Sequence, residues 1–169
     1  RVVGCKWVFK IKYDGDGNID KYRARLVAQG FNQQYGVDHF QTFAPVLHYK
    51  SLRTIITIVA ALDYELQQMD VPTAFLNAKC EEEVYMKLSP GSPQIKDGKV
   101  CRLLKTIYGI KQAPRAWNRD LDRAIVALGY RRADADACVY VRKSKTGKVI
   151  ILPIFVDDIF PACATADLD

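Results

Sequence analysis

One stretch decides how the rest of the sequence is interpreted: Val149-Ile150-Ile151-Leu152-Pro153-Ile154-Phe155-Val156-Asp157-Asp158-Ile159-Phe160. An apolar, largely β-branched run is followed by two adjacent carboxylates and then by apolar residues, which predicts a β-hairpin with an acidic tip. Adjacent negative charges repel each other unless a cation neutralises them, and oxygen ligands suit a hard divalent ion such as Mg²⁺. Taken alone, an Asp-Asp pair is more often an ordinary polar turn.

A third carboxylate, Asp70, ends the strand-like segment 64–70. Three acids, two at a hairpin tip and one at a strand end, can hold the pair of metal ions used for in-line phosphoryl transfer. The sequence therefore indicates a candidate two-metal site at Asp70, Asp157 and Asp158.

Length and composition fit one ordinary domain or two small lobes. The 169 residues are 49% hydrophobic and 26% charged, as in a soluble globular domain, and no apolar run reaches the length of a membrane span. Five scattered cysteines without a C-x-x-C pair argue against a zinc site or a disulfide framework and for a reducing compartment. The net charge of +6 suits a polyanion such as nucleic acid, although a basic solvated surface explains it equally well.

The N-terminal quarter predicts a basic β-hairpin. Residues 5–13 alternate lysines with apolar residues as a half-buried strand does, residues 14–18 form a turn, and residues 19–28 return as a second strand. Arg23 and Arg25 lie two apart and hence on one face, where guanidinium groups can bind a triphosphate. The alternative is that both arginines are merely solvated.

The remaining elements predict an α+β protein. Ser51 is expected to cap a helix with one apolar face, and a second helix is expected to begin near Pro114 and end at Gly129. Gly109 would allow a close backbone approach. Segments 64–70, 84–86, 99–104, 137–142 and 148–156 read as strands. Strands mixed with two core helices favour a sheet with its helices on one face.

Several sequence blocks, together with this order of elements, resemble the reverse transcriptase domain of copia-type LTR retrotransposon Pol polyproteins. The resemblance covers nearly the whole chain. The blocks that carry it are Lys6-Trp7-Val8-Phe9-Lys10, residues 22–31, Thr42-Phe43-Ala44-Pro45-Val46, residues 68–77, Glu83-Val84-Tyr85-Met86, residues 107–117 and Phe155-Val156-Asp157-Asp158.

The resemblance implies a polymerase fold and a division of the chain. A ferredoxin-like antiparallel sheet with helices on one face would be the palm, at residues 64–169, and the β-rich residues 1–63 would be the fingers. We expect the thumb, connection and RNase H segments to lie outside this chain, which also lacks an initiator Met and a signal peptide.

The resemblance also implies roles for individual residues. Asp70, Asp157 and Asp158 would be the catalytic acids that bind two Mg²⁺ ions, or Mn²⁺ in their place, with the Val71 carbonyl as a further ligand. The dNTP would be bound by Phe75, which crowds a ribose 2′-hydroxyl, by Tyr108 and Gly109, and by Arg25, with Arg23 or Lys21 as alternatives. The template and primer would be contacted by Lys111, Gln112, Arg115, Phe155 and Val156.

As an RNA-directed DNA polymerase, the protein would add dNTPs to a DNA primer on an RNA or DNA template. Its other partners would be the thumb, RNase H and integrase segments of the Pol polyprotein, with no membrane involved. Its location would be the cytoplasm, within a retrotransposon particle, or the nucleus. We expect the isolated chain to be a weak or inactive polymerase.

Two departures from the family pattern bear on activity. Phe155 stands where the family has Tyr, which leaves the acids intact, and the residues after Phe160 differ from the usual small-residue turn. An alternative function is therefore that of a catalytically inactive remnant that binds nucleic acid or serves as a scaffold. A third hypothesis, a nucleotidyl cyclase with a similar palm, does not explain residues 6–31 and 107–117.

Overall fold

A computed structural model describes residues 1–167 of the chain. The chain forms two compact units, each discontinuous in sequence. Unit 1 comprises Arg1–Phe43 and Phe75–Trp117, and unit 2 comprises Ala44–Ala74 and Asn118–Asp169. The assignment of residues 1–63 to fingers and 64–169 to palm stays a prediction, and each unit is described by itself.

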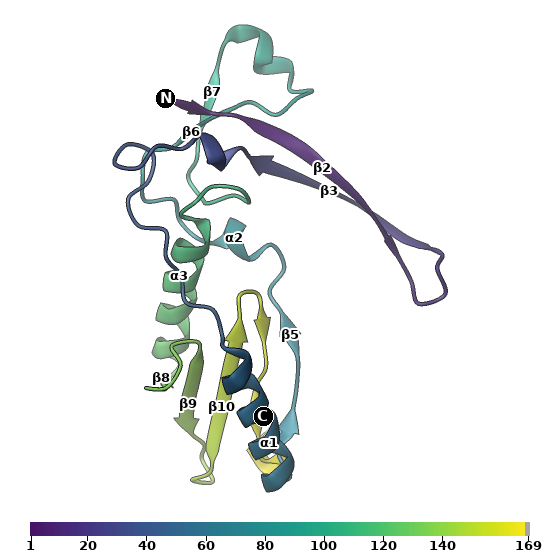
Figure 1. Cartoon of the computed structure of the whole chain (residues 1–169), viewed down its shortest axis with the longest axis vertical. Coiled ribbons are helices and arrows are strands. Elements are labelled where there is room, and N and C mark those ends of the chain that lie inside the picture. The colour runs from purple at the N-terminus through teal and green to yellow at the C-terminus, as the bar shows by residue number, and fades with distance from the viewer. Residues whose placement is uncertain (168–169) are drawn as a thin grey trace. The chain divides into compact units, whose positions relative to one another are not determined.

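The predicted N-terminal hairpin is confirmed in unit 1 (Figure 1). Strand β2 (Cys5–Tyr13) pairs antiparallel with β3 (Ile19–Ala28). The side chain of Asp14 closes the turn by accepting hydrogen bonds from the N–H groups of Asp16 and Asn18, and this bonding lowers the pKa of Asp14. The prediction of a half-buried strand is wrong. Most residues of β2 are exposed, and β2 pairs only with β3 in a two-stranded sheet among the described residues.

The rest of unit 1 is a small sheet with short helical turns. Strand β1 (Val2–Val3) runs parallel to β6 (Tyr85–Lys87), which pairs antiparallel with β7 (Val100–Arg102). The short helices are η1 (Gly30–Asn32), α2 (Ala74–Asn77, with Ala74 in unit 2) and η2 (Pro93–Asp97). Its core consists of Val3, Ala28, Val84, Met86, Ile110 and Ala113.

Unit 2 is built on an antiparallel sheet centred on β10 (Val149–Phe155), a run of five consecutive buried residues as the apolar sequence predicts. One edge of β10 pairs with β9 (Val139–Lys143), which pairs with β8 (Arg131–Arg132). The other edge pairs with β11 (Asp158–Ile159) and β12 (Ala162–Cys163). Helix η3 (Thr165–Asp167) ends the described chain.

The strand predicted at residues 64–70 is divided in two. Strand β4 (Glu65–Leu66) pairs with β12, and β5 (Met69–Asp70) pairs with β11. Between them, the Gln67 N–H donates to the Pro161 carbonyl at 3.0 Å. The segment is therefore divided at the same level as its neighbours: β4 pairs with β12, and β5 pairs with the separate strand β11.

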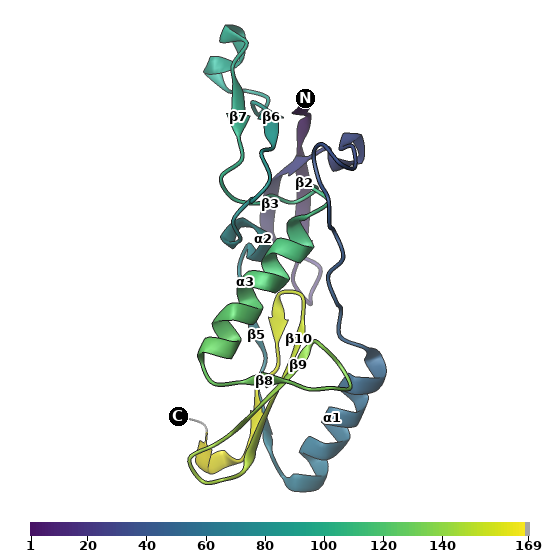
Figure 2. The same ribbon diagram turned by 90° about the vertical axis from the view of Figure 1, so that its left-hand side faces the viewer.

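Helices cover both faces of this sheet, so the predicted placement on one face is wrong. Helix α1 (Tyr49–Leu62) packs Ile55 and Val59 against Val139 and Ile151. Helix α3 (Ala113–Ala127) packs Ile125 against the cluster of Tyr140, Leu152 and Ile154. Successive strand residues point to opposite faces, so these two clusters lie on opposite sides of β9 and β10. Figure 2 shows α1 and α3 on the two sides of these strands. The predicted mixture of helices and sheets is confirmed, whereas the palm-and-fingers arrangement stays a prediction.

The start of α1 differs from the prediction because its cap comes from a distant residue. Helix α1 begins at Tyr49 with His48 as the N-cap residue, so Ser51 lies inside the first turn. The buried carboxylate of Asp136 accepts the His48 N–H at 3.0 Å and a hydrogen bond from the Ser51 side chain. An acid on a loop of unit 2 therefore satisfies the helix start that a local serine was expected to cap.

The end of α3 confirms the prediction at Gly129. The Tyr130 N–H donates to the Ile125 carbonyl and the Gly129 N–H to the Val126 carbonyl, which is a Schellman motif. Gly129 has a φ of 83°, a backbone conformation that glycine adopts without steric cost. Among the helices of the described residues, none is long and apolar enough to cross a membrane.

Candidate active site

The acidic hairpin predicted around Asp157 is confirmed in unit 2. Phe155 pairs with Asp158 across β10 and β11, so Val156 and Asp157 form a two-residue turn. Val156 has a φ of 60°, in the left-handed region that a β-branched residue rarely adopts. Such strain persists only where the surroundings hold it, and it is concentrated at functional sites. The backbone thus places Asp157 at the tip and Asp158 at the start of the returning strand.

Asp70 lies on β5, the strand that pairs with β11 beside this tip, and the metal-binding role of the three acids stays a prediction. In the register of β5 and β11, Asp70 is the direct partner of Asp158, so both side chains lie on the same face of the sheet. The Val71 N–H donates to the Asp157 carbonyl at 2.9 Å and extends the pairing to the turn. The structure therefore places Asp70 opposite Asp158 and the Val71 backbone against that of Asp157.

Gln68 is a residue of this cluster that the sequence analysis missed. Its Nε2 donates to Asp158 Oδ1 at 3.1 Å and so favours one orientation of the carboxylate. The available signal was its spacing, since Gln68 stands two residues before Asp70 in a strand-like segment. Phe155 is also held, because its half-buried ring packs on the core under α1 with its centroid 6.5 Å from that of Tyr49.

The donor chemistry of this cluster fits a hard divalent cation. Its ligands would be carboxylate and carbonyl oxygens, and Asp70 is exposed while Asp157 and Asp158 are partly exposed. Within residues 1–167, no three His, Cys, Asp or Glu side chains are gathered closely enough to hold an ion. Of the predicted ligands, Asp70 and Asp158 are the two that the structure places directly opposite each other on neighbouring strands.

A second group of predicted residues meets in unit 1, around Tyr108. The ring centroids of Phe75 and Tyr108 are 5.1 Å apart, and the guanidinium carbon of Arg25 lies 5.4 Å from the Tyr108 centroid. Such a cation–π contact orients the guanidinium while leaving its N–H donors available. Phe75 also packs on the core of unit 1, and its carbonyl accepts a hydrogen bond from the Thr106 hydroxyl.

Gly109 makes the close backbone approach that the sequence predicts. Its φ is 97°, and a Cβ at this position would lie 2.1 Å from the Ala28 carbonyl oxygen. The Ala28 N–H donates to the Tyr108 carbonyl at 2.8 Å. Any larger residue would push the Tyr108 segment away from β3, so Gly109 serves to bring Tyr108 next to Arg25.

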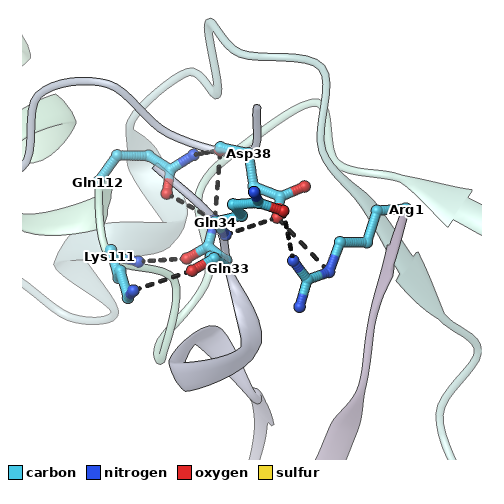
Figure 3. Close-up of polar contacts among 6 residues, drawn as sticks. All are labelled: Arg1, Gln33, Gln34, Asp38, Lys111 and Gln112. Carbon is cyan, nitrogen blue, oxygen red and sulfur yellow. Dashed lines mark hydrogen bonds and ion pairs between the residues drawn. The ribbon is translucent and has the colours of Figure 1, made fainter. Parts of the chain in front are cut away.

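A buried amide network fastens the segment that follows Gly109 (Figure 3). Gln33 and Gln112 point toward each other, with Gln33 Nε2 donating to Gln112 Oε1 at 3.0 Å. Gln33 Oε1 accepts the Lys111 N–H at 2.7 Å, and Gln112 Nε2 donates to the Asp38 carbonyl at 3.0 Å. The Asp38 carboxylate accepts the Gln34 N–H, and Arg1 lies 3.9 Å from it. The network joins residues 33–38 to the start of α3.

This network bears on two residues predicted to contact template and primer. Gln112 is 2% exposed and uses its amide within unit 1, while Lys111 Nζ donates to the Gln33 carbonyl at 3.0 Å. Arg115 is partly exposed in the first turn of α3. Arg23 and Lys21 are exposed on β3, on the same face as Arg25 but nearer the hairpin turn. Contact of any of these residues with nucleic acid stays a prediction.

A family model described as reverse transcriptase (RNA-dependent DNA polymerase) matches residues 1–167. The Pol polyprotein from transposon TNT 1-94 of Nicotiana tabacum is 44% identical over 159 residues, which are 94% of this chain and 12% of that relative. The Pol polyprotein from transposon RE2 of Arabidopsis thaliana is 38% identical over 94% of this chain and 11% of its own length.

A more distant relative is the transposon Ty1-ER2 Gag-Pol polyprotein of Saccharomyces cerevisiae, 28% identical over 94% of this chain and 8% of its own length. The chain therefore spans a small part of each of these relatives. No solved structure matches it.

Proposed function

Because the chain belongs to the reverse transcriptase (RNA-dependent DNA polymerase) family, we propose that it adds deoxynucleotides to a primer 3′-hydroxyl on an RNA or DNA template. The resemblance to copia-type Pol polyproteins predicted from its sequence blocks is confirmed by the plant relatives. The observation that carries the proposal is the cross-strand pairing of Asp70 with Asp158 beside the Asp157 turn.

In this proposal the three carboxylates hold two divalent metal ions, with the Val71 carbonyl as a further ligand. Bound Mg²⁺ would stabilise negative charge on the attacking and leaving oxygens of the phosphoryl transfer. The amide of Gln68 holds Asp158 in one orientation, and the Val71–Asp157 hydrogen bond holds the turn. Rigid placement matters because misplacement by a fraction of an ångström costs orders of magnitude in rate.

The residues around Tyr108 would bind the incoming nucleotide. Among Arg25, Arg23 and Lys21, we assign the triphosphate to Arg25, because it is the one whose cation lies over the Tyr108 ring. Its planar guanidinium can donate two parallel hydrogen bonds to phosphate oxygens. The Phe75 ring beside Tyr108 would crowd a ribose 2′-hydroxyl and so favour dNTPs over rNTPs.

Primer extension on an RNA template with Mg²⁺ tests the proposal. Asp157→Asn should lower the rate on the order of 100-fold or more, because it removes a charged ligand of the proposed metal ions, which would stabilise the developing negative charge. Template–primer affinity should stay nearly unchanged, since affinity comes mainly from basic contacts to phosphate. The matched control is Asp134→Asn, which alters an exposed aspartate in unit 2 and should retain full activity.

Activity of Asp157→Asn within about tenfold of wild type would remove Asp157 from the metal site. A wild-type chain that binds the duplex but extends no primer would instead favour the inactive nucleic-acid-binding remnant.

A further inference from the structure

The side-chain amides of Gln33 and Gln112 form a hydrogen-bond chain that can run in only one direction. It begins at the Lys111 N–H, which donates to Gln33 Oε1, and it ends at the Asp38 carbonyl, which accepts from Gln112 Nε2 (Figure 3). Between these ends, Gln33 Nε2 donates to Gln112 Oε1. A backbone N–H can only donate and a carbonyl can only accept, so neither amide can exchange its oxygen and nitrogen. The two side chains therefore have a single arrangement.

Both amides are buried and are used inside unit 1. Gln33 is 4% exposed and Gln112 is 2% exposed, and Gln33 Nε2 also lies 3.4 Å from the Asp38 carbonyl oxygen. Turning either amide toward a ligand would leave its present partners unpaired in a buried place, which is costly. The arrangement therefore suits these amides to holding other groups in place.

What they hold is the segment 108–112. Gln33 binds its far end twice, because its side chain accepts the Lys111 N–H at 2.7 Å and its carbonyl accepts Lys111 Nζ at 3.0 Å. At the near end, the Ala28 N–H donates to the Tyr108 carbonyl at 2.8 Å. The segment is thus attached to the end of β3 on one side and to Gln33 on the other.

Tyr108 needs both attachments because Gly109 follows it. Glycine has the largest range of backbone conformations, so the start of α3 alone does not fix the orientation of Tyr108. The Lys111 N–H, two residues beyond Gly109, is where Gln33 limits this freedom. The ring that is fixed in this way is the one beside Phe75 and under the Arg25 guanidinium.

We propose that Gln33 and Gln112 are positioning residues of the nucleotide site. Their amides keep the Tyr108 ring beside Arg25 and Phe75, and they raise the affinity for the incoming dNTP without contacting it. This inference rests on the proposed polymerase function. It gives Gln112 a role within unit 1 in place of a contact with template or primer.

Steady-state primer extension with varied dNTP tests the proposal. Gln33→Met keeps the length of the side chain but removes both polar groups. It should raise the KM for dNTP about tenfold or more, since a misplacement of about 1 Å caused by a substitution remote from the chemistry can cost on the order of 100-fold. Its kcat should change little, because the proposed metal ligands belong to unit 2. Gln41→Met, at an exposed position of unit 1, is the matched control and should behave like wild type.

The split between KM and kcat separates positioning from loss of folded protein. Partial unfolding would lower the apparent kcat, because less enzyme is active, and would leave KM unchanged. Purely additive damage would multiply the KM effects of two substitutions. In this proposal Gln33 and Gln112 act in one chain, so Gln33→Met combined with Gln112→Met should raise KM no more than either substitution alone.

Gln112→Met also distinguishes positioning from direct contact. Its KM for dNTP should rise as in Gln33→Met, while its affinity for template–primer, measured at equilibrium, should equal that of wild type. Weakened template–primer binding with an unchanged KM would mean that Gln112 contacts nucleic acid, and this result would overturn the proposal.

A pH profile of Gln33→Glu gives a readout that general damage would not move. Its carboxyl keeps an acceptor for the Lys111 N–H, and only its protonated form can also donate a hydrogen bond to Gln112 Oε1. The KM of Gln33→Glu should therefore fall toward the wild-type value as the pH is lowered. Dividing it by the KM of Gln33→Met at the same pH cancels the titration of neighbouring groups such as Asp38 and Lys111.

The outcomes separate this inference from the proposed function. If the wild-type chain extends primers and both methionine variants keep its KM, the positioning role alone is wrong. If both methionine variants fail to fold, Gln33→Glu decides, and a KM for it that does not fall relative to wild type at low pH would contradict the hydrogen-bond chain. A wild-type chain that extends no primer and, in calorimetry with Mg²⁺ and template–primer, binds no dNTP would overturn the proposed function and this inference with it.

Discussion

At the scale of single residues, Arg25 differs from the other basic side chains of its strand in having a fixed position. Its guanidinium lies over the Tyr108 ring, and its side chain is partly buried, whereas Arg23 and Lys21 are exposed. We expect Arg25→Gln to raise the KM for dNTP about tenfold or more, because a hydrogen bond to a charged group contributes about 1.5–3 kcal/mol. Arg23→Gln, measured in the same steady-state assay, should have a much smaller effect. A larger increase for Arg23→Gln or Lys21→Gln would move the triphosphate contact outward along β3.

Phe75 has both a structural and a proposed selective role, and the two can be separated. Phe75→Val should raise rNTP incorporation relative to dNTP, because it removes the bulk proposed to meet the 2′-hydroxyl. It should also destabilise unit 1 by about 1–3 kcal/mol, since Phe75 packs against the hydrophobic core of that unit. The matched control is Phe43→Val, at a position 77% exposed, which should change neither quantity. Lower stability with an unchanged rNTP/dNTP ratio would leave Phe75 as a core residue alone.

At the scale of elements, the start of α1 depends on one buried carboxylate. Besides the His48 N–H and Ser51, Asp136 accepts the Cys138 N–H at 2.9 Å, and His48 Nδ1 lies 3.1 Å from it. Asp136→Asn replaces an acceptor oxygen with an NH₂ group that faces these donors. We expect a loss of about 1–3 kcal/mol in the free energy of unfolding at neutral pH, measured by urea denaturation. Asp134→Asn, two residues away and exposed, is the control and should unfold like wild type.

The same contact predicts how stability depends on pH. Burial alone would raise the pKa of Asp136, but the hydrogen bonds from Ser51, Cys138 and His48 outweigh it and hold the pKa below its ordinary value. The contribution of Asp136 is therefore complete above the unfolded pKa of about 3.9 and is lost as the pH falls through the lower folded value. The stability difference between wild type and Asp136→Asn should shrink in that acidic range. An unchanged difference down to the acid transition would contradict the assignment.

Elements encoded within a few neighbouring residues could be predicted from the sequence. The turn closed by Asp14, the end of α3 at Gly129 and the tip at Asp157 are each specified locally by turn residues or alternating polarity. From the sequence, Asp70 could be expected to lie near Asp157 and Asp158, but not directly opposite Asp158. The pairing of two strands that are distant in sequence is not encoded in either strand alone.

What could not be predicted depends on contacts between residues far apart in the chain. Asp136 lies 88 residues from His48, and Gln112 lies 79 residues from Gln33. Neither polar residue carries a local pattern that reveals its partner. Likewise, the apolar stripes of α1 and α3 predict burial but do not say which face of the sheet each helix covers.

At the scale of the whole molecule, charge is divided unequally between the two units. Unit 1 contains 15 Lys and Arg against 8 Asp and Glu, a net charge of +7, whereas unit 2 contains 10 against 11, a net charge of −1. The net charge of +6 therefore arises from unit 1, while the proposed metal-binding acids belong to unit 2. Nucleic-acid affinity and chemistry should accordingly depend on different residues.

Salt dependence tests this division. Removing one cation that binds a phosphate should reduce the slope of log K against log salt by about 0.9 for a B-form duplex. Lys6→Gln with Lys12→Gln, both on the face of β2 that carries its lysines, should lower the slope for an RNA–DNA duplex by about 1–2 and weaken binding most at low salt. Lys145→Gln with Lys148→Gln, in the exposed loop between β9 and β10 of unit 2, removes the same charge and should leave the slope unchanged. Equal decreases in both double variants would mean that binding follows total charge rather than its concentration on unit 1, and a larger decrease in the second would assign duplex binding to unit 2.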